Sequence, residues 1–260
     1  RGYSRFPFAG GLFFMTVYGA VFARGGSKGV PRKNLRQIAG TSLLELSIAM
    51  GLASEGIDRM FCSTDSDEIA TEAIRLGAEV PFLRPETLAQ DDSPEWTAWQ
   101  HLARFLTQEG ASESDFLVSL PTTSPLRACE DIENALELFR QGTFDLVLGI
   151  SESTRSPWFN MVVREQSSEV SLVAGVEGER IGRRQDAPAV FDITTVVYVT
   201  TLGFVINSQG LFDGTVRCTD GVFSAADKWQ FRCYNRANPD RRLPNPMNSV
   251  VQSVSYARHL

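Results

Sequence analysis

A basic loop rich in glycine is the segment of this 260-residue chain whose residue types point most directly to chemistry. Residues 23–34 read ARGGSKGVPRKN and follow an apolar run at 17–22 that is typical of a buried strand. Glycines let backbone N–H groups turn toward an anion, and Arg24, Lys28 and Lys33 add cations to the same stretch. A planar guanidinium can donate two parallel hydrogen bonds to phosphate oxygens, whereas an ammonium acts as a point charge. The loop therefore predicts a polyphosphate site rather than a solvated basic turn.

Several other classes of protein are excluded by motif and composition. The loop fits neither G-x-x-x-x-G-K-[ST] nor G-x-G-x-x-G, so it is neither a Walker loop nor a dinucleotide fingerprint. The chain carries 25 Lys and Arg against 31 Asp and Glu, and this net charge of -6 argues against a nucleic-acid-binding protein. Its 4 cysteines are scattered and form no C-x-x-C pair, which predicts no disulfide framework and favours the reducing cytoplasm.

Strands and helices alternate in the segment that must position this loop. We expect strands at 17–22, 59–63, 80–83, 116–120 and 146–150, and helices at 42–54, 66–76, 93–108 and 130–141. This alternation predicts an α/β fold with a three-layer, mostly parallel, Rossmann-like sheet. Ligands of such sheets bind beyond the carboxyl ends of the strands, so the polar loops there should converge on one site.

The two ends of the chain differ from this pattern. The apolar run that ends before Arg24 imitates a secretory signal or a membrane span, but we interpret its last part as the first strand, with residues 1–14 as a leader outside the fold. Residues 214–260 contain seven Lys and Arg, three Asp and no Glu. We expect this tail to be either disordered or a replacement of the natural sequence. A solvated basic tail is preferred to a nucleic-acid arm, so neither nucleic acid nor a membrane is an expected partner.

Five segments in the same order carry a resemblance to a known family. The loop ARGGSKGVPRKN resembles the signature of the acylneuraminate cytidylyltransferases, or CMP-sialic acid synthetases, and their legionaminate and pseudaminate relatives. The further segments are STDSDEIA (63–70), FLRPETLAQDDSP (82–94), LPTTSPLR (120–127) and RRQDAPAVF (183–191). The resemblance implies a fold of the nucleotide-diphospho-sugar transferase type over residues 15–213. It also implies a covering or dimerisation extension at about 150–200, and a homodimer.

The resemblance implies a reaction as well. The family transfers CMP from CTP to the anomeric hydroxyl of a nine-carbon keto-sugar acid, releases diphosphate and uses Mg²⁺. Such a transfer needs alignment of the reacting groups and stabilisation of developing charge more than covalent help. Two alternatives stay open: a nucleotidyltransferase for another base or sugar acid, and a catalytically silent nucleotide-binding module.

Candidate site residues follow from the matched motifs. The catalytic candidates are Arg24, Lys28 and Lys33; the nucleotide-binding candidates are Gly25, Gly26, Ser27, Asn34, Arg84 and Ser93; the candidates for the sugar acid and the floor of the site are Ser124, Arg127, Arg183, Arg184 and Gln185. Simpler roles compete with some of these assignments. Arg84 could cap a strand end, Arg127 could pair with a carboxylate of the next helix, and Arg183 could be a surface charge.

The chain departs from the family pattern at three places. The family carries a D-x-D near its C-terminus that holds magnesium, whereas Asp220 and Asp227 lie near that place in a different context. The metal ligands are therefore unknown, and we expect a chain that binds CTP but turns it over slowly. Pro121 and Thr122 stand where the family has Gln-Pro, which leaves the contact to the base or the sugar at this position open. After RRQ the family often has a polar Asn/Gly segment, whereas this chain has Phe191, Asp192, Ile193 and Thr194, which suggests a nonulosonic acid other than ordinary sialic acid.

Overall fold

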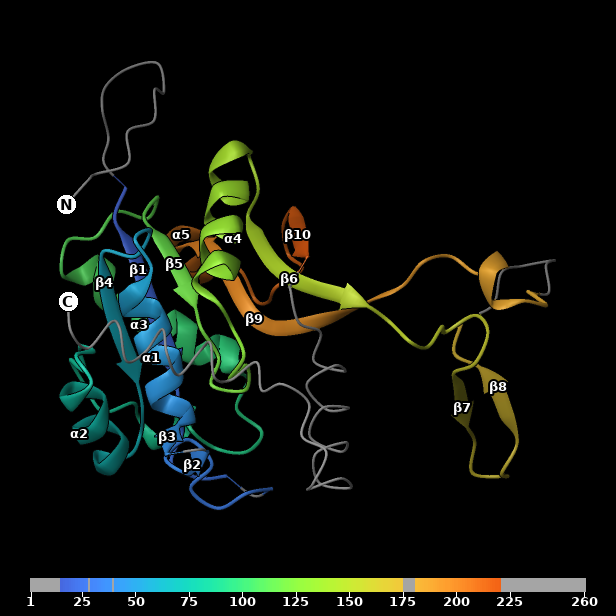
Figure 1. Ribbon diagram of the computed structural model, residues 1–260, viewed down its shortest axis with the longest axis horizontal. Helices are drawn as coiled ribbons and strands as arrows, with labels where there is room; N and C mark the ends of the chain where they lie inside the picture. The colour runs from blue at the N-terminus through green and yellow to red at the C-terminus, as the bar shows by residue number, and fades with distance from the viewer. Residues whose placement is uncertain (1–14, 28, 39, 175–180, 221–260) are drawn as a thin grey trace.

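A mostly parallel sheet forms the centre of the molecule (Figure 1). The computed structural model describes residues 15–27, 29–38, 40–174 and 181–220. The strands of this sheet lie in the order β10 (Val216–Asp220), β6 (Leu146–Glu152), β9 (Phe191–Thr201), β5 (Phe116–Ser119), β1 (Val17–Phe22) and β4 (Arg59–Ser63). Strand β9 pairs antiparallel with both β5 and β6, and the other pairings are parallel. The expected α/β class is confirmed.

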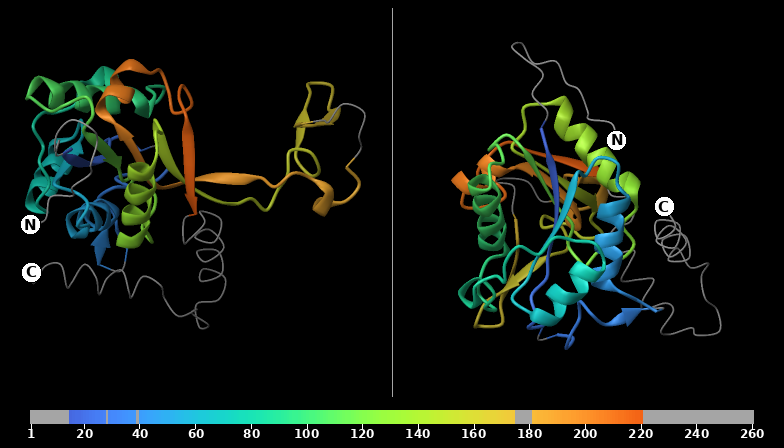
Figure 2. Two further views of the ribbon diagram at one scale, coloured as in Figure 1. Left: turned by 90° about the horizontal axis from the view of Figure 1, so that it is seen from above. Right: turned by 90° about the vertical axis from the view of Figure 1, so that its left-hand side faces the viewer.

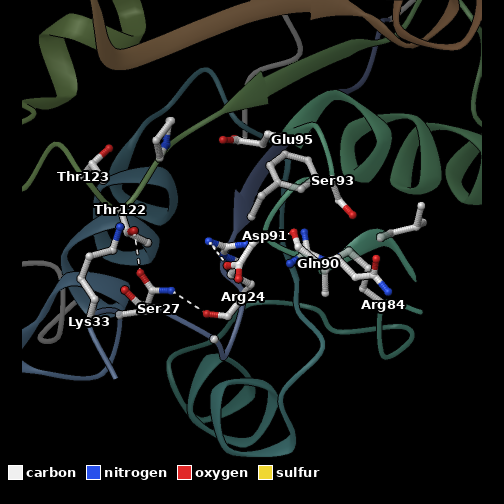
Figure 3. Close-up of a pocket in the computed structure, with 16 residues that line it drawn as sticks. Arg24, Ser27, Lys33, Arg84, Gln90, Asp91, Ser93, Glu95, Thr122 and Thr123 are labelled. Atoms are coloured by element: carbon white, nitrogen blue, oxygen red, sulfur yellow. Dashed lines mark hydrogen bonds and ion pairs between the residues drawn. The ribbon is translucent and has the colours of Figure 1, made fainter. Parts of the chain in front are cut away.

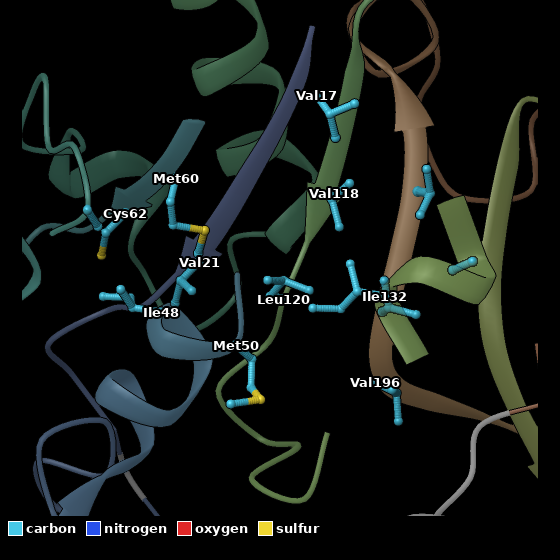
Figure 4. Close-up of a cluster of buried hydrophobic side chains, with 14 of the residues drawn as sticks. Val17, Val21, Ile48, Met50, Met60, Cys62, Val118, Leu120, Ile132 and Val196 are labelled. Atoms are coloured by element: carbon cyan, nitrogen blue, oxygen red, sulfur yellow. The ribbon is translucent and has the colours of Figure 1, made fainter. Parts of the chain in front are cut away.

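Helices cover both faces of the sheet, as Figure 2 shows. One face is covered by α1 (Leu43–Ala53), α2 (Asp67–Arg75) and α4 (Cys129–Gln141), and the other by α3 (Glu95–Gln108) and α5 (Leu202–Asn207). Side chains of a strand alternate between faces, so Val17 and Val21 join the first cluster (Figure 4) and Tyr18 and Ala20 the second. These two apolar layers hold the three-layer body together.

Local sequence signals explain where the helices begin and end. The Ser42 hydroxyl accepts from the Glu45 N–H at 3.1 Å and begins α1, after the short β2 (Gln37–Ile38) and β3 (Thr41–Ser42). Ser66 begins α2 in the same way, and Gly77 ends it with a φ of +97°. Ser93 does not cap α3, because its hydroxyl donates instead to the Thr87 carbonyl at 3.0 Å.

One expected strand is wrong. Two isolated bridges stand in its place: Phe61 pairs with Glu79, just before the segment 80–83, and Thr64 pairs with Leu83, its last residue. Pro81 has no N–H to donate to a ladder, which explains why no continuous strand forms there. The segment leads instead into the short helix η1 (Glu86–Leu88).

An arm projects from the body between β6 and β9 (Figure 1). It carries a hairpin of β7 (Val162–Arg164) and β8 (Val170–Leu172) and the short helix η2 (Arg184–Asp186). The expected extension at 150–200 is therefore too long at its C-terminal end. Strand β9 returns to the sheet from Phe191, which pairs with Glu152 of β6. Val196 to Val199 are buried in the body, and Tyr198 and Val199 pair with both β5 and β6.

The expected domain boundary at 213/214 also moves. Strand β10 adds to the sheet edge beside β6, so the fold continues at least to Asp220. The expected leader, residues 1–14, and the rest of the tail, residues 221–260, lie outside the described residues. Among the helices of the described part of the chain, none is long and apolar enough to cross a membrane.

Candidate active site

A pocket of about 310 Å³ opens beyond the carboxyl ends of β1 and β5 (Figure 3). Its wall comes from three segments: residues 22–27 and 33–34 at the end of β1 and in the loop after it, residues 84–95 before and at the start of α3, and residues 121–123 after β5. Seven expected site residues line it: Arg24, Gly26, Ser27, Lys33, Asn34, Arg84 and Ser93. The convergence of strand-end loops that the sequence predicts is therefore confirmed for these three segments.

The two glycines at the start of the first loop have different environments. The Gly25 N–H donates to the Asp65 carboxylate at 2.9 Å, and a Cβ at Gly25 would lie 3.0 Å from the Cβ of Ser66. Gly25 is therefore fitted to the loop after β4 and does not line the pocket. A Cβ at Gly26 would meet no atom of the described residues within 4 Å. This leaves backbone at Gly26 that a ligand can approach closely.

Asn34 holds the glycine-rich loop in place through hydrogen bonds of its side chain and its backbone carbonyl. Its side-chain N–H donates to the Arg24 carbonyl at 3.1 Å, and its side-chain oxygen accepts from the Thr122 hydroxyl at 2.8 Å. Its backbone carbonyl accepts from the Leu44 N–H at 2.9 Å, which ties the loop to α1. Asn34 and Thr122 are both buried, so these bonds are protected from water.

The cations of the loop face the opposite wall. The Arg24 guanidinium lies 3.0 Å from the Asp91 carboxylate and also donates to the Gln90 carbonyl at 3.0 Å. This partly exposed pair bridges the first loop and the loop before α3. Lys33 lines the pocket beside them, and Lys28 lies outside the described residues. A phosphate in the pocket would compete with Asp91 for the Arg24 fork.

Arg84 is buried at the pocket wall with 6% of its surface exposed. Its backbone N–H donates to the Thr64 carbonyl at 2.7 Å, and its Nη2 lies 3.7 Å from the Asp65 carboxylate. Within the described residues its buried Nε has no hydrogen-bond partner. Burial lowers the pKa of Arg84, and the charges of Asp65, Cys62 and Glu95 oppose this shift. A buried donor without a partner costs about 1–3 kcal/mol, so Arg84 is prepared for a ligand that accepts hydrogen bonds.

Ser124 and Arg127 lie behind the pocket rather than in its lining. The Ser124 hydroxyl is 2.9 Å from that of Thr195, and Arg127 is buried among backbone carbonyls. Its guanidinium donates to the carbonyls of Pro121 at 2.7 Å and Thr195 at 3.3 Å, and to that of Val196. Burial lowers the pKa of Arg127, with Asp131 opposing the shift. Both residues brace the loop after β5 against β9 and so support the floor of the site.

Arg183, Arg184 and Gln185 are on the arm and are not brought to the pocket of the same chain. Arg183 pairs with Asp186 at 2.9 Å, and the Arg184 guanidinium donates to the Ser153 carbonyl at 3.4 Å. All three are exposed. Within one chain the two arginines behave as surface charges and Gln185 as an exposed polar residue.

Sequence reasoning did not assign several lining residues to the site. Gln90, Asp91, Glu95, Thr122 and Thr123 line the pocket although no role was given to them. Their position in the sequence is the signal for them: Thr122 and Thr123 follow the end of β5, Gln90 and Asp91 precede α3, and Glu95 is its first residue. Glu95 in particular reads in the sequence as an ordinary acidic residue of a first helical turn.

The described residues do not assemble a metal centre of their own. They contain no group of three or more His, Cys, Asp or Glu side chains that could hold a metal ion. Asp220 ends the edge strand β10, which three strands separate from β1, and Asp227 lies outside the described residues. The carboxylates in the pocket lining are Asp91 and Glu95, and Asp91 is paired with Arg24. This donor set does not fit a protein cage for a divalent cation.

Comparison with known proteins places the fold and pocket in a family. The model of the Cytidylyltransferase family matches residues 19–192, more than half of the chain. The chain belongs to this family of nucleotidyltransferase enzymes. It is 30% identical over 192 residues to CMP-N,N'-diacetyllegionaminic acid synthase of Campylobacter jejuni, covering 74% of this chain and 80% of that one. It is also 30% identical over 199 residues to the synthase of the same name from Legionella pneumophila, covering 76% and 83%.

Solved structures agree on the fold. A CMP:2-keto-3-deoxy-manno-octonic acid synthetase solved in complex with CTP superposes with a TM-score of 0.59 at 14% identity, covering 86% of this chain and 99% of that one. A 4-diphosphocytidyl-2C-methyl-D-erythritol synthase superposes with a TM-score of 0.57 at 11% identity, covering 84% and 98%. At these identities the likeness concerns the fold alone.

Proposed function

We propose that the protein transfers CMP from CTP to the anomeric hydroxyl of a sialic-acid-like nonulosonic acid and releases diphosphate. The observation that carries the proposal is the pocket itself. It combines an accessible glycine backbone at Gly26, the cations Arg24 and Lys33, and the buried Arg84 with its unpartnered Nε. Family membership and relatives named as CMP-legionaminic acid synthases support the choice of nucleotide and sugar class.

The reaction makes limited demands on the protein. The anomeric oxygen attacks the α-phosphorus, the bond from that phosphorus to the bridging oxygen breaks, and the hydroxyl proton is released. Arg24 and Lys33 would bind the triphosphate and stabilise the charge that grows on the departing diphosphate. Asn34 would keep the loop in position through its bonds to Arg24 and Thr122. Ser93 would lie beside the nucleoside.

Mg²⁺ is proposed as the cofactor, although the described residues form no cage for it. In proteins Mg²⁺ keeps several waters and is commonly bound through substrate phosphates with one or two carboxylates. Bound with CTP, it would neutralise phosphate charge that Arg24 and Lys33 otherwise face alone. A second candidate function is a nucleotide-binding module that turns over poorly, since Asp91, one of the two carboxylates of the pocket lining, is paired with Arg24.

The arm supports a homodimer. Its hairpin is apolar and exposed, with Val162 54%, Val170 62% and Leu172 47% exposed, and an isolated two-stranded hairpin is marginal in water. A second copy would cover these side chains. It would also bring Arg183 and Arg184 to a neighbouring pocket, where an arginine could pair with the carboxylate of the sugar acid. The compartment proposed for this enzyme is the cytoplasm.

The proposal is tested by incubating the full chain with CTP, Mg²⁺ and a panel of nonulosonic acids, with products identified by mass. The panel contains N-acetylneuraminic, legionaminic and pseudaminic acids. We expect a CMP-sugar and one diphosphate per sugar consumed. Diphosphate release without a CMP-sugar, or no reaction with any acid, would contradict the transfer. CTP binding without any release would favour the second candidate.

A further inference from the structure

We infer that Glu95 selects the base of the nucleotide, by accepting a hydrogen bond from the exocyclic amino group of cytosine. The inference rests on the proposed function and deepens it. It assigns base discrimination to a carboxylate that, by sequence alone, marks only the start of α3.

The exposed residue Glu95 lies at the pocket wall (Figure 3), where its carboxylate has one hydrogen bond from the protein. Glu95 is the first residue of α3, and its Oε1 accepts from the Trp99 indole N–H at 3.2 Å. Trp99 is itself 3% exposed and stacks on Phe22, with 5.8 Å between ring centroids. In the described part of the chain this indole is the one group that donates to the Glu95 side chain. One carboxylate oxygen is therefore oriented by the protein, and the other is left for a donor from a ligand.

A complementary donor lines the same pocket. The Nε of Arg84 is buried and has no partner within the described residues, and the charge of Glu95 acts on this guanidinium. The two groups are not joined by an ion pair in the described structure. The wall of the pocket thus offers both a cationic donor and an anionic acceptor, two kinds of partner that a heterocyclic base can satisfy together.

The hydrogen-bonding edge of cytosine matches this pair. Cytosine presents two acceptors, O2 and N3, and one donor, the 4-amino group. Arg84 supplies donors for the acceptors, and Glu95 accepts from the amino group. Uracil presents an N3–H toward the guanidinium and a carbonyl toward the carboxylate, so both contacts become repulsive. A site built to bond a polar group of its substrate discriminates strongly against an analogue that lacks it.

The test compares CTP with UTP in the full chain and in Glu95→Gln. The two side chains have nearly the same shape, but a glutamine amide can also donate to the uracil carbonyl. We expect the ratio of kcat/KM for CTP to that for UTP to fall by roughly ten- to a hundredfold. Titration calorimetry with each nucleotide should show the same loss of preference without depending on turnover. The matched control is Glu86→Gln, which changes an exposed carboxylate outside the pocket lining and should keep the preference.

The outcomes separate the inference from the proposed function. If the unaltered chain binds CTP and forms a CMP-sugar but Glu95→Gln keeps its preference for CTP, the role of Glu95 is refuted and the function stands. If the unaltered chain does not bind CTP, both are refuted. An equal loss of preference in Glu86→Gln would also overturn the assignment, because the effect would then not come from the pocket carboxylate.

Discussion

The Thr122 hydroxyl donates to the side-chain oxygen of Asn34 at 2.8 Å, across 88 residues of sequence. Through the Asn34 amide this bond reaches the Arg24 carbonyl, so the loop after β5 positions the phosphate-binding loop after β1. Thr122 stands where the sequence departs from the pattern of its family. Thr122, the residue that differs from the family pattern, thus makes a hydrogen bond that stabilises the site.

Thr122→Val is expected to weaken CTP binding. The change leaves the Asn34 oxygen buried without its donor, which costs about 1–3 kcal/mol of unfolding free energy and loosens the loop. We expect the KM for CTP to rise several-fold while kcat changes less, measured by steady-state kinetics beside urea unfolding. Thr122→Ser keeps the hydroxyl and is the control. A folded Thr122→Val enzyme with an unchanged KM would refute this positioning role.

Gly26→Ala is expected to separate binding from stability. A Cβ at Gly26 meets no protein atom within 4 Å, so the midpoint of thermal unfolding should stay the same or rise slightly. The affinity for CTP, measured by calorimetry, should fall about tenfold because the methyl group occupies the approach to the backbone. Gly210→Ala, also without a neighbour within 4 Å, should leave affinity unchanged. Equal affinities in both variants would remove the basis for a glycine cradle.

Arg84→Met is expected to weaken CTP binding without lowering the stability of the fold. Methionine replaces a buried guanidinium whose Nε has no partner, so the unfolding free energy should stay constant or rise by about 1 kcal/mol. CTP affinity should fall at least tenfold, because the ligand loses a charged donor. Denaturant unfolding and calorimetry on the same preparations measure both effects. A marked loss of stability with normal CTP binding would instead identify Arg84 as a purely structural residue.

Stability should fall on the acid side because of His101. Burial lowers the pKa of this imidazole below its ordinary value of 6.5, and Arg84 and Arg104 lower it further. The unfolded chain then takes up the proton first, so the unfolding free energy decreases as the pH falls below 6.5. In urea unfolding curves, the unfolding free energy of His101→Gln should decrease less than that of the unaltered chain as the pH falls below 6.5. Parallel pH curves for the two proteins would contradict the assignment.

Local patterns predicted the parts of the fold that depend on neighbouring residues. Strand β1 and helices α1 and α2 follow from apolar periodicity, and Ser42 and Ser66 begin their helices because their hydroxyls accept from nearby N–H groups. Pro81 shows the limit of that approach. The apolar run around it reads as a strand, but the missing N–H interrupts pairing with β4.

Contacts that are distant in sequence could not be predicted in this way. The bond between Gly25 and Asp65 and the bond between Asn34 and Thr122 depend on how strands are ordered in the sheet. The bond from Trp99 to Glu95 spans only four residues of α3, but the pocket that Glu95 lines is formed with loops from distant parts of the chain. Arg184 matches its motif but is exposed on the arm and does not line the pocket.

Titration calorimetry of the full chain with CTP and Mg²⁺ tests the central claim most directly. We predict one binding site per chain, at least tenfold weaker in Lys33→Ala, which removes a cation from the pocket wall, and unchanged in Arg140→Ala, which alters the last turn of α4. Absence of binding heat in the unaltered chain, or equal affinity in the two variants, would contradict the assignment of this pocket to a nucleoside triphosphate.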